Sequence, residues 1–212
     1  MEKKDFTVNF SDELEKIYVK KIIEFDKIYS SLIEELNFDE KSLKGIEFNE
    51  CLFKVIDFTK AEVENLTFVD CIFENCDLSN MVLSGKSFIR CNFISCRLVG
   101  INIDKYLLHN VLFKDCTLKY SNFADNKFKN VIFDNCNIDD GRFYENKLES
   151  IFFENVSMRN IEILNCVLKD IDLSTCNIEG LKVNPSDLWG VVVNYNQALL
   201  LSRILGIIIK ED

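Results

Sequence analysis

Residues 71–100 read CIFEN CDLSN MVLSG KSFIR CNFIS CRLVG, and the third place of every block of five is Phe or Leu. We call this third place the centre. Outward from this stretch, every fifth residue from Phe38 to Val193 is Phe, Leu, Ile, Val or Met at all 32 positions. A period of five fits neither the 3.6-residue period of a helix nor the two-residue period of a strand. The sequence therefore predicts short straight edges separated by regular corners.

The places on either side of the centre support this interpretation. Two residues after the centre, Gly, Asn and Asp dominate, and these are the residues that tolerate tight or left-handed corners. Two residues before the centre lie all nine cysteines of the chain. They are Cys51, Cys71, Cys76, Cys91, Cys96, Cys116, Cys136, Cys166 and Cys176. Their spacing suits neither a zinc site nor a redox pair, so we interpret them as small apolar packing residues.

Blocks that lie 20 residues apart resemble one another, and we call each such set a column. A repeat after every four blocks predicts a coil with four sides. One such column contains only Phe, at positions 53, 73, 93, 113, 133 and 153. Successive coils would satisfy their backbone groups by bonding to each other. At strand-like spacing, about eight coils would form a rod roughly 38 Å long.

Several blocks resemble the consensus of the pentapeptide-repeat family, A-(D/N)-L-x-x. The best matches are residues 76–80 (CDLSN), 121–125 (SNFAD) and 136–140 (CNIDD), and the resemblance covers roughly residues 36–193. It implies an all-β solenoid, the right-handed quadrilateral β-helix of that family. A fold of this kind does not by itself define a function.

The C-terminal tail resembles one group within this family, the quinolone-resistance (Qnr-type) proteins. The matching residues are 190–193 (GVVV), 197–198 (QA), 200–201 (LL) and 205–207 (LGI), which lie outside most of the repetitive part. The resemblance implies a homodimer joined at its C-terminal ends. It also implies an acidic rod that imitates DNA, binds DNA gyrase and topoisomerase IV, and protects them from quinolones. Some Qnr proteins carry loops that break the repeat, and the unbroken phase here argues against such loops.

The periodicity divides the chain into three parts: residues 1–36, a repeat domain over 37–193, and a C-terminal segment over 194–212. In the first part, Asp12 and Glu15 are typical of a helix start. Apolar residues from Leu14 to Leu36 then follow helical spacing, which predicts an amphipathic α-helix roughly 36 Å long. Such a helix could simply plug the first coil.

A second location for this helix comes from the residue just before each centre, which should point outward. One column of these residues is largely apolar, and we call it the apolar row: Leu52, Ile72, Asn92, Leu112, Ile132 and Phe152. Outward apolar groups in a row are unusual on a solvated surface. We hypothesise that the N-terminal helix docks here, in its own chain or swapped from a partner. The alternative is a contact surface for another protein.

The C-terminal segment predicts a short helix over 196–205 that ends at Gly206. This segment could cap the last coil, form a dimer interface, or do both. The apolar residues that would form the dimer interface are Leu199, Leu200, Ile204, Leu205, Ile207, Ile208 and Ile209.

The net charge of −10 argues against direct binding of nucleic acid. Acidic residues gather on two neighbouring sides of the predicted coil. One side contains Asp57, Asp77, Asp139, Asp140 and Glu179, and the other contains Glu62, Glu64, Asp104, Asp125, Glu145 and Glu162. Surface acids often serve only solubility, so charge alone leaves the DNA-mimic interpretation open, and the tail resemblance favours it.

The sequence gives little support to an enzyme. The one histidine, His109, has no nucleophile signature beside it, and no phosphate loop, metal-site spacing or cofactor motif is present. Trp189 and Tyr195 are interpreted as cap packing. We expect a cytoplasmic protein with reduced thiols, because no targeting signal or membrane-spanning run is apparent. The alternative function is an interaction scaffold, or an immunity protein against another gyrase poison.

Overall fold

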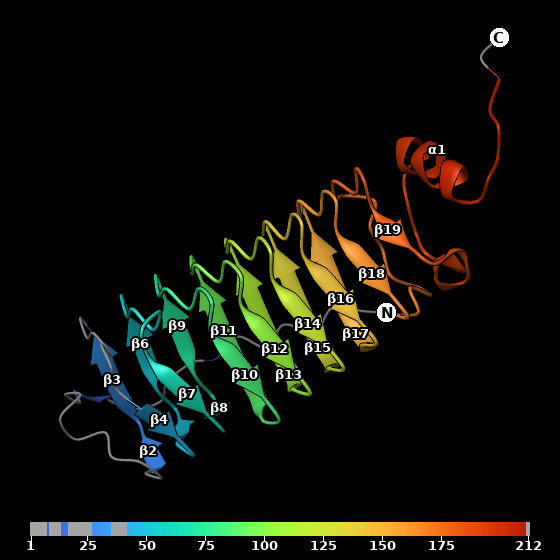
Figure 1. Ribbon diagram of the computed structural model, residues 1–212. Coiled ribbons are helices and arrows are strands. Elements are labelled where there is room, and N and C mark those ends of the chain that lie inside the picture. The colour runs from blue at the N-terminus through green and yellow to red at the C-terminus, as the bar shows by residue number, and fades with distance from the viewer. Residues whose placement is uncertain (1–7, 9–13, 17–26, 35–41, 211–212) are drawn as a thin grey trace.

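The computed structural model is an elongated solenoid of about eight coils with one helix, α1 (Tyr195–Ile204), at its C-terminal end (Figure 1). It describes residues 8, 14–16, 27–34 and 42–210. Each coil has four sides, which we number in chain order from one coil: face 1 has the centre Phe53, face 2 Phe58, face 3 Val63 and face 4 Phe68. The predicted four-sided solenoid is therefore confirmed.

Three of the four faces carry strands. Faces 4 and 1 share one sheet, whose short strands are β2 (Lys27–Tyr29), β3 (Ser31–Glu34), β5 (Glu47–Asn49), β6 (Leu52–Lys54), β8 (Thr67–Val69) and β9 (Ile72–Glu74). Its longer strands turn the corner between the two faces: β11 (Ser87–Ile94), β13 (Leu107–Lys114), β15 (Lys127–Asp134) and β17 (Lys147–Glu154). Face 3 carries β4 (Ser42–Lys44), β7 (Glu62–Glu64), β10 (Val82–Ser84), β12 (Asn102–Asp104), β14 (Asn122–Ala124), β16 (Arg142–Tyr144), β18 (Glu162–Leu164) and β19 (Lys182–Val183).

Neighbouring strands are parallel, and each residue lies opposite its equivalent in the next coil over nearly the whole rod. Phe93, for example, lies opposite Phe73 on one side and Phe113 on the other. The register shifts in β17, where Lys129 lies opposite Ser150. Parallel bonding between coils thus satisfies the backbone that a single short strand could not satisfy alone.

Face 2 differs because its coils meet through isolated bridges, such as Asp57 with Asp77 and Asn137 with Ser157. The residue before the centre accepts a hydrogen bond from the backbone N–H two residues later. Asp57 Oδ1 accepts from Thr59 N at 2.8 Å, and Asp77 Oδ1 accepts from Ser79 N at 2.9 Å. These local turns compete with strand hydrogen bonds, which explains why face 2 has isolated bridges where the other faces have strands.

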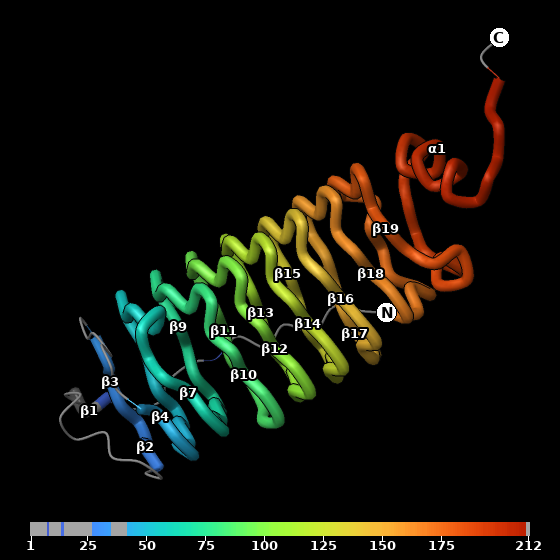
Figure 2. Tube along the Cα trace, viewed as in Figure 1, coloured from blue at the N-terminus to red at the C-terminus, as the bar shows by residue number. Residues whose placement is uncertain are grey.

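The corners have the left-handed conformation that the sequence predicts. Among the residues that the structure describes, the 22 non-glycine residues with positive φ, between 44° and 62°, all lie two residues after a centre. They include Val55 at 53° and Tyr120 at 60°, which are uncommon residues in this region. The repeated coil geometry therefore overrides the local preference of single residues. Figure 2 shows these corners as regular bends of the tube.

A ladder of phenylalanine rings runs along the inside of face 1. Rings in successive coils stack with centroids 4.6 Å apart for Phe53 and Phe73, 4.9 Å for Phe93 and Phe113, and 4.8 Å for Phe113 and Phe133. All nine cysteines are buried and free, as their packing role requires. Cys96, for instance, lies with its Sγ 3.3 Å from the carbonyl oxygen of Phe73.

Two buried asparagines take the cysteine place at one inner corner. Asn126 accepts from Tyr106 N at 2.8 Å and donates to Ile103 O at 2.8 Å. Asn146 in turn accepts from Asn126 N at 2.9 Å and donates to Phe123 O at 2.8 Å. These amides satisfy buried backbone groups between coils, which a thiol does only weakly.

The predicted N-terminal helix is wrong wherever the structure describes this region. Strands β2 and β3 occupy most of residues 27–34, and β1 (Glu15–Lys16) pairs with β3. The reason is that Ile28 and Ile33 continue the five-residue phase and lie buried as centres of an earlier coil. Residues 17–26 and 35–36 of the predicted helix lie outside the described residues.

The C-terminal helix begins and ends within one residue of its predicted bounds. Asn194 accepts from Gln197 N at 3.0 Å while Gln197 Oε1 accepts from Asn194 N at 2.8 Å, which forms a capping box. Gln197 also donates to the carbonyl oxygens of Leu173 and Cys176, each at 2.7 Å. A 3-10 helix at Pro185–Leu188 precedes this cap, which thus covers the open end of the last coil. Within the described ranges, no helix has the length and hydropathy that a membrane span requires.

Candidate functional site

The predicted acidic residues of face 2 lie at both ends of its column of bridges. Asp57 and Glu179 are exposed, and Asp140 is half-buried at a corner, where its Oδ1 accepts from Asn160 Nδ2 at 3.2 Å. Asp77 is half-buried with Arg97 Nε 3.5 Å away. Asp57 also accepts from Thr59 Oγ1 at 2.6 Å, and the hydroxyl and N–H of Thr59 lower the pKa of this carboxyl despite partial burial.

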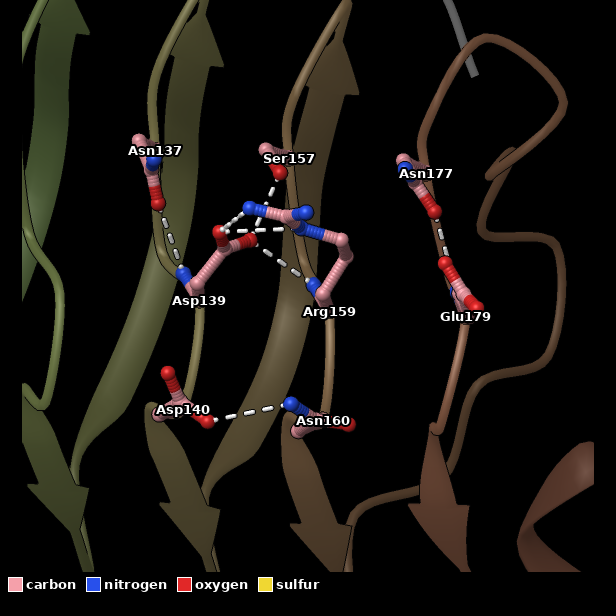
Figure 3. Close-up of polar contacts among 8 residues, drawn as sticks. All are labelled: Asn137, Asp139, Asp140, Ser157, Arg159, Asn160, Asn177 and Glu179. Carbon is pink, nitrogen blue, oxygen red and sulfur yellow. Dashed lines mark hydrogen bonds and ion pairs between the residues drawn. The ribbon is translucent and has the colours of Figure 1, made fainter.

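Asp139 is the exception, because its side chain is only 2 % exposed. Its Oδ1 accepts from Ser157 Oγ at 2.6 Å and from Arg159 N at 2.9 Å, and its Oδ2 accepts from Arg159 Nη2 at 2.8 Å (Figure 3). Burial disfavours the charged carboxylate, but these hydrogen bonds outweigh it and lower the pKa of Asp139. Asp139 therefore ties two coils together, and its carboxylate is fully engaged in that contact.

Substitution of Asp139 by Ala should lower the free energy of unfolding by about 2–3 kcal/mol at pH 7, because the hydroxyl of Ser157 and the N–H groups of Arg159 lose their acceptor. The loss is limited because the side chain of Arg159 is 51 % exposed, so solvent screens its attraction to Asp139. A lowered folded pKa gives stability that is present above the unfolded pKa, about 3.9, and is lost as the pH falls through the folded value.

Urea unfolding at pH 7 and pH 3 checks this expectation. The gap between wild type and the Ala variant should be widest at pH 7 and narrower at pH 3. An equal gap at both values would show that the charge of Asp139 contributes nothing to stability.

Some acidic residues of face 3 and its corners form ion pairs, and the others are exposed. Glu162 lies 3.2 Å from Arg142 Nε and 2.7 Å from Lys182 Nζ, one coil to either side. Hydrogen bonding from Lys182, together with the charges of both cations, lowers the pKa of Glu162. Glu64 pairs with Lys44 at 3.7 Å and Asp104 with Lys105 at 3.4 Å. Glu62, Asp125 and Glu145 are exposed.

Within the described part of the chain, five of the eleven predicted acids therefore lie within 4 Å of a base. Four of the five have that base one coil away in the same column, because successive coils place equivalent residues side by side. The acidic surface that remains is narrower than expected and consists of six carboxylates. These are Asp57, Glu62, Asp125, Asp140, Glu145 and Glu179.

The structure also places the other residues that sequence reasoning singled out. His109 is half-buried on face 4, and burial together with Lys129 and Arg90 lowers its pKa, so it is neutral at pH 7. In the described part of the chain, no group of three or more His, Cys, Asp or Glu side chains could hold a metal ion. A shallow recess of about 350 Å³ lies between Lys119, Asp140 and Glu179.

The apolar row lies on the outside of face 1, as predicted. Ile72, Asn92 and Ile132 are nevertheless buried, whereas Leu52, Leu112 and Phe152 are half-buried. Beyond Phe152, a groove of about 650 Å³ is lined by Ile171 and Val192.

The C-terminal end exposes a group of apolar side chains. Leu199, Leu200, Leu205, Ile207, Ile208 and Ile209 are all exposed, and Ile204 is half-buried against the core. Trp189 and Tyr195 were interpreted as cap packing, but they are 72 % and 78 % exposed. Tyr195 begins the helix that carries Leu199 and Leu200, and we call the exposed apolar residues from Tyr195 to Ile209 the C-terminal apolar end. The ring of Trp189 instead lies 5.2 Å from Lys169 Nζ. Clustered exposed apolar groups of this kind are typical of an interaction surface.

Comparison with known protein families agrees with this fold. Residues 66–143 match the family model of the pentapeptide repeat region. Among solved structures, full-length QnrB1, a plasmid-mediated fluoroquinolone resistance protein, is 17% identical, with 86% of this chain and 99% of that one covered at a TM-score of 0.36. HetL, involved in heterocyst differentiation regulation in Nostoc sp. strain PCC 7120, is 9% identical, with 81% and 87% covered at a TM-score of 0.33. No curated protein matches this chain in sequence.

Proposed function

We propose that this chain, whose residues 66–143 are a pentapeptide-repeat region, binds DNA gyrase or topoisomerase IV in place of DNA and so protects the enzyme from quinolones. The observation that carries the proposal is the set of six accessible carboxylates on faces 2 and 3 and their corners. They lie along a straight rod whose coils repeat at about 4.8 Å. The Qnr-like spacing of the tail supports the same function.

The ion pairs between successive coils limit the negative charge that this surface could present to a partner. A paired carboxylate such as Asp77 or Glu162 contributes little net field, so the attraction would come mainly from the six accessible acids. DNA carries one charge per about 3.4 Å along each strand, which is denser than this surface. We therefore propose a contact that depends on the positions of the six accessible carboxylates and weakens as the salt concentration rises.

Binding to purified gyrase tests this proposal. The triple variant Glu62→Gln, Asp125→Asn and Glu145→Gln removes three accessible acids of face 3 and its corner. We expect the Kd for gyrase to rise at least tenfold, because each removed carboxylate weakens the attraction to a DNA-binding groove. Linear DNA should compete with the wild-type protein for the enzyme.

A control variant carries the same change of charge elsewhere. Glu50, Asp170 and Asp172 are exposed on face 1 and along its edge with face 4, and their amide variants should change the Kd less than twofold. Equal weakening by both triples would show that net charge alone matters. Absence of binding at micromolar protein would favour a scaffold with another partner.

We propose that the protein acts as a homodimer through the C-terminal apolar end. Ile208 is 89 % exposed and Leu200 39 % exposed in the single chain, so both are available to a second copy. A symmetric pair would bury these groups against their equivalents.

Substitution of both Leu200 and Ile208 by Asp should dissociate this dimer. Sedimentation should then give the mass of one chain, 24.7 kDa, with a dissociation constant raised at least a hundredfold. Val82→Asp, on exposed face 3, is the control and should leave the dimer intact. A wild-type protein that sediments as one chain at micromolar concentration would contradict the dimer.

A further inference from the structure

One edge of β17 is open, although the solenoid continues beyond it. β17 pairs with β15 on one side, and among the described residues no strand pairs with its other side (Figure 1). In a regular coil, Asn92 N donates to Cys71 O of the coil before it, at 2.9 Å. The equivalent groups beyond β17, Asp172 N and Ile151 O, form no such bond in the described structure. The sheet of faces 4 and 1 therefore ends before residues 166–175, the next part of the chain on these two faces.

The sequence of residues 166–175 explains why the sheet ends there. Asp172 Oδ1 accepts from Ser174 N at 2.8 Å, which is the same local turn that replaces strands on face 2. Thr175, at the corner, does not have a positive φ, and its Oγ1 accepts from Asn155 N at 3.2 Å. In earlier coils the equivalent N–H donates to a backbone carbonyl. Side chains thus take the hydrogen bonds that would have continued the sheet.

The corner within β17 is also irregular. Ser150 does not have a positive φ, whereas the equivalent corners before and after it, Asn130 and Asp170, have φ values of 53° and 62°. The register of β17 shifts at this point, and the centre Leu148 is only half-buried. The regular stack of coils is therefore interrupted between β17 and residues 166–175.

A groove follows the open edge of β17. Its larger part, about 650 Å³, is lined by residues 148–155 and by residues 169–172 of the next coil. A smaller recess of about 470 Å³ continues it along residues 145–149, and the two recesses share lining residues, among them Lys169. We call them together the β17 groove. It runs beside the whole strand, whose eight residues span roughly 26 Å.

The β17 groove offers an apolar wall and an excess of acid. Phe152 is half-buried on this wall, and Val192 is 46 % exposed. Four acids and one base line the larger recess, which gives it a formal charge of −3. Glu149 is already paired with a lysine at 2.8 Å, but Asp170 and Asp172 are exposed. The groove therefore favours a ligand with apolar and positively charged groups.

We infer that the β17 groove binds an extended, positively charged segment of another protein by strand addition. In a parallel sheet, the backbone groups of alternate residues bond to opposite neighbours. Asn135 N donates to Glu154 O across the pair with β15, so Ile151 C=O and Phe153 N–H serve the open side. A partner strand donates to one of these groups and accepts from the other, while its cations lie near the two exposed acids.

A partner protein suits this groove better than this chain does. A second copy carries a net charge of −10 and would be repelled by the acids. The start of the chain comes closer, because the N–H of Val8 donates to Asn92 Oδ1 at 3.2 Å when this amide is oriented to satisfy both its groups. The seven residues before Val8 contain two acids and two lysines, so their side chains lack the excess positive charge that the groove favours.

Fluorescence anisotropy with a labelled peptide of sequence KVKIKV tests this inference. The peptide should bind the full chain at micromolar protein, and the Asp170→Asn/Asp172→Asn variant should raise the Kd at least tenfold, because each lost carboxylate weakens the attraction. Asn keeps the local turn, as Asn137 does on face 2 by accepting from Asp139 N at 2.9 Å. The variant should therefore keep the circular dichroism spectrum of wild type.

Backbone methylation of the peptide separates strand addition from attraction by charge. One version is N-methylated at its lysines and the other at its apolar residues, and both keep the same charge. Only one set of N–H groups faces β17 in an extended peptide, so one version should bind at least tenfold more weakly than the other. Equal binding of the two versions would overturn strand addition.

The matched control is Glu50→Gln/Asp115→Asn, which removes two exposed acids at corners away from the groove. It should bind the peptide as wild type does, and equal weakening by both double variants would overturn the proposed site. Absence of peptide binding at micromolar protein would also overturn it. Because Asp170 and Asp172 serve as controls for gyrase binding, failure here leaves the proposed function untouched.

Two further outcomes would assign the groove to this chain and overturn the inference. Peptide binding that appears only after deletion of residues 1–7 would identify the start of the chain as the occupant. Release of the peptide as the protein concentration rises would show that a second copy competes for the groove.

Discussion

Replacement of Phe113 by Ala should lower the free energy of unfolding by about 3–5 kcal/mol, the usual cost of truncating a fully buried aromatic residue. Phe113 is 0 % exposed and stacks between Phe93, with centroids 4.9 Å apart, and Phe133, at 4.8 Å. In a solenoid, each coil contacts only its neighbours, so a gap in the middle also weakens the coupling between the two ends. Urea unfolding followed by circular dichroism should show the loss, and the transition should broaden or split.

Val82→Ala is the control that removes apolar side-chain atoms from an exposed place. Val82 lies beside a centre and points outward, and its removal should change stability by less than about 0.5 kcal/mol. A Phe113→Ala variant within about 1 kcal/mol of wild type would show that the ring ladder is not what holds the coils together.

Substitution of Asn126 by Ala should lower the free energy of unfolding by about 2–6 kcal/mol. The change leaves the buried N–H of Tyr106 and the buried carbonyl of Ile103 without the partners they have at 2.8 Å, and each such group costs about 1–3 kcal/mol. Thermal and urea unfolding measure the loss.

Cys136→Ala tests whether the hydrogen bonds of Asn126 or its volume matter. Cys136 occupies the same place relative to its centre, and its thiol lies 3.4 Å from the carbonyl of Phe113 as a weak donor. We expect a cost of about 1 kcal/mol for this variant. Equal losses in the two variants would contradict a special role for the buried amides.

The five-residue phase was sufficient to predict the coils, because each place in the block has one physical role. Centres fill the core, and residues such as Asn75 and Asp115 adopt the left-handed corner. The five-residue phase also includes Ile28 and Ile33, for which the sequence analysis predicts a helix. Ile28 and Ile33 satisfy both helical spacing and the phase of five, and the strand pairing of β2 and β3 with the next coil decides between them.

The C-terminal helix was predictable for a local reason. Asn194 and Gln197 form a capping box whose residues lie within four positions of each other, so no distant contact is needed to recognise it. The exposure of Trp189 and Tyr195 has no such local signal. It depends on how the cap leaves the last coil, which the sequence pattern does not encode.

The ion pairs of the candidate surface could have been found from the sequence. Asp77 with Arg97, Asp139 with Arg159 and Glu162 with Lys182 each occupy the same place in two successive coils. The net charge of a face does not reveal these pairs, because it sums the charges of all residues whether or not they are in contact. The contact between Val8 and Asn92 was out of reach, since it spans four coils of sequence.

Supercoiling by DNA gyrase in the presence of a quinolone tests the proposed function most directly. Wild-type protein at micromolar concentration should restore supercoiling that the drug has blocked. The Glu62→Gln, Asp125→Asn, Glu145→Gln variant should need at least tenfold more protein for the same restoration, and the Glu50→Gln, Asp170→Asn, Asp172→Asn control should match wild type. Neither restoration nor inhibition of supercoiling by the wild-type protein would contradict the proposal.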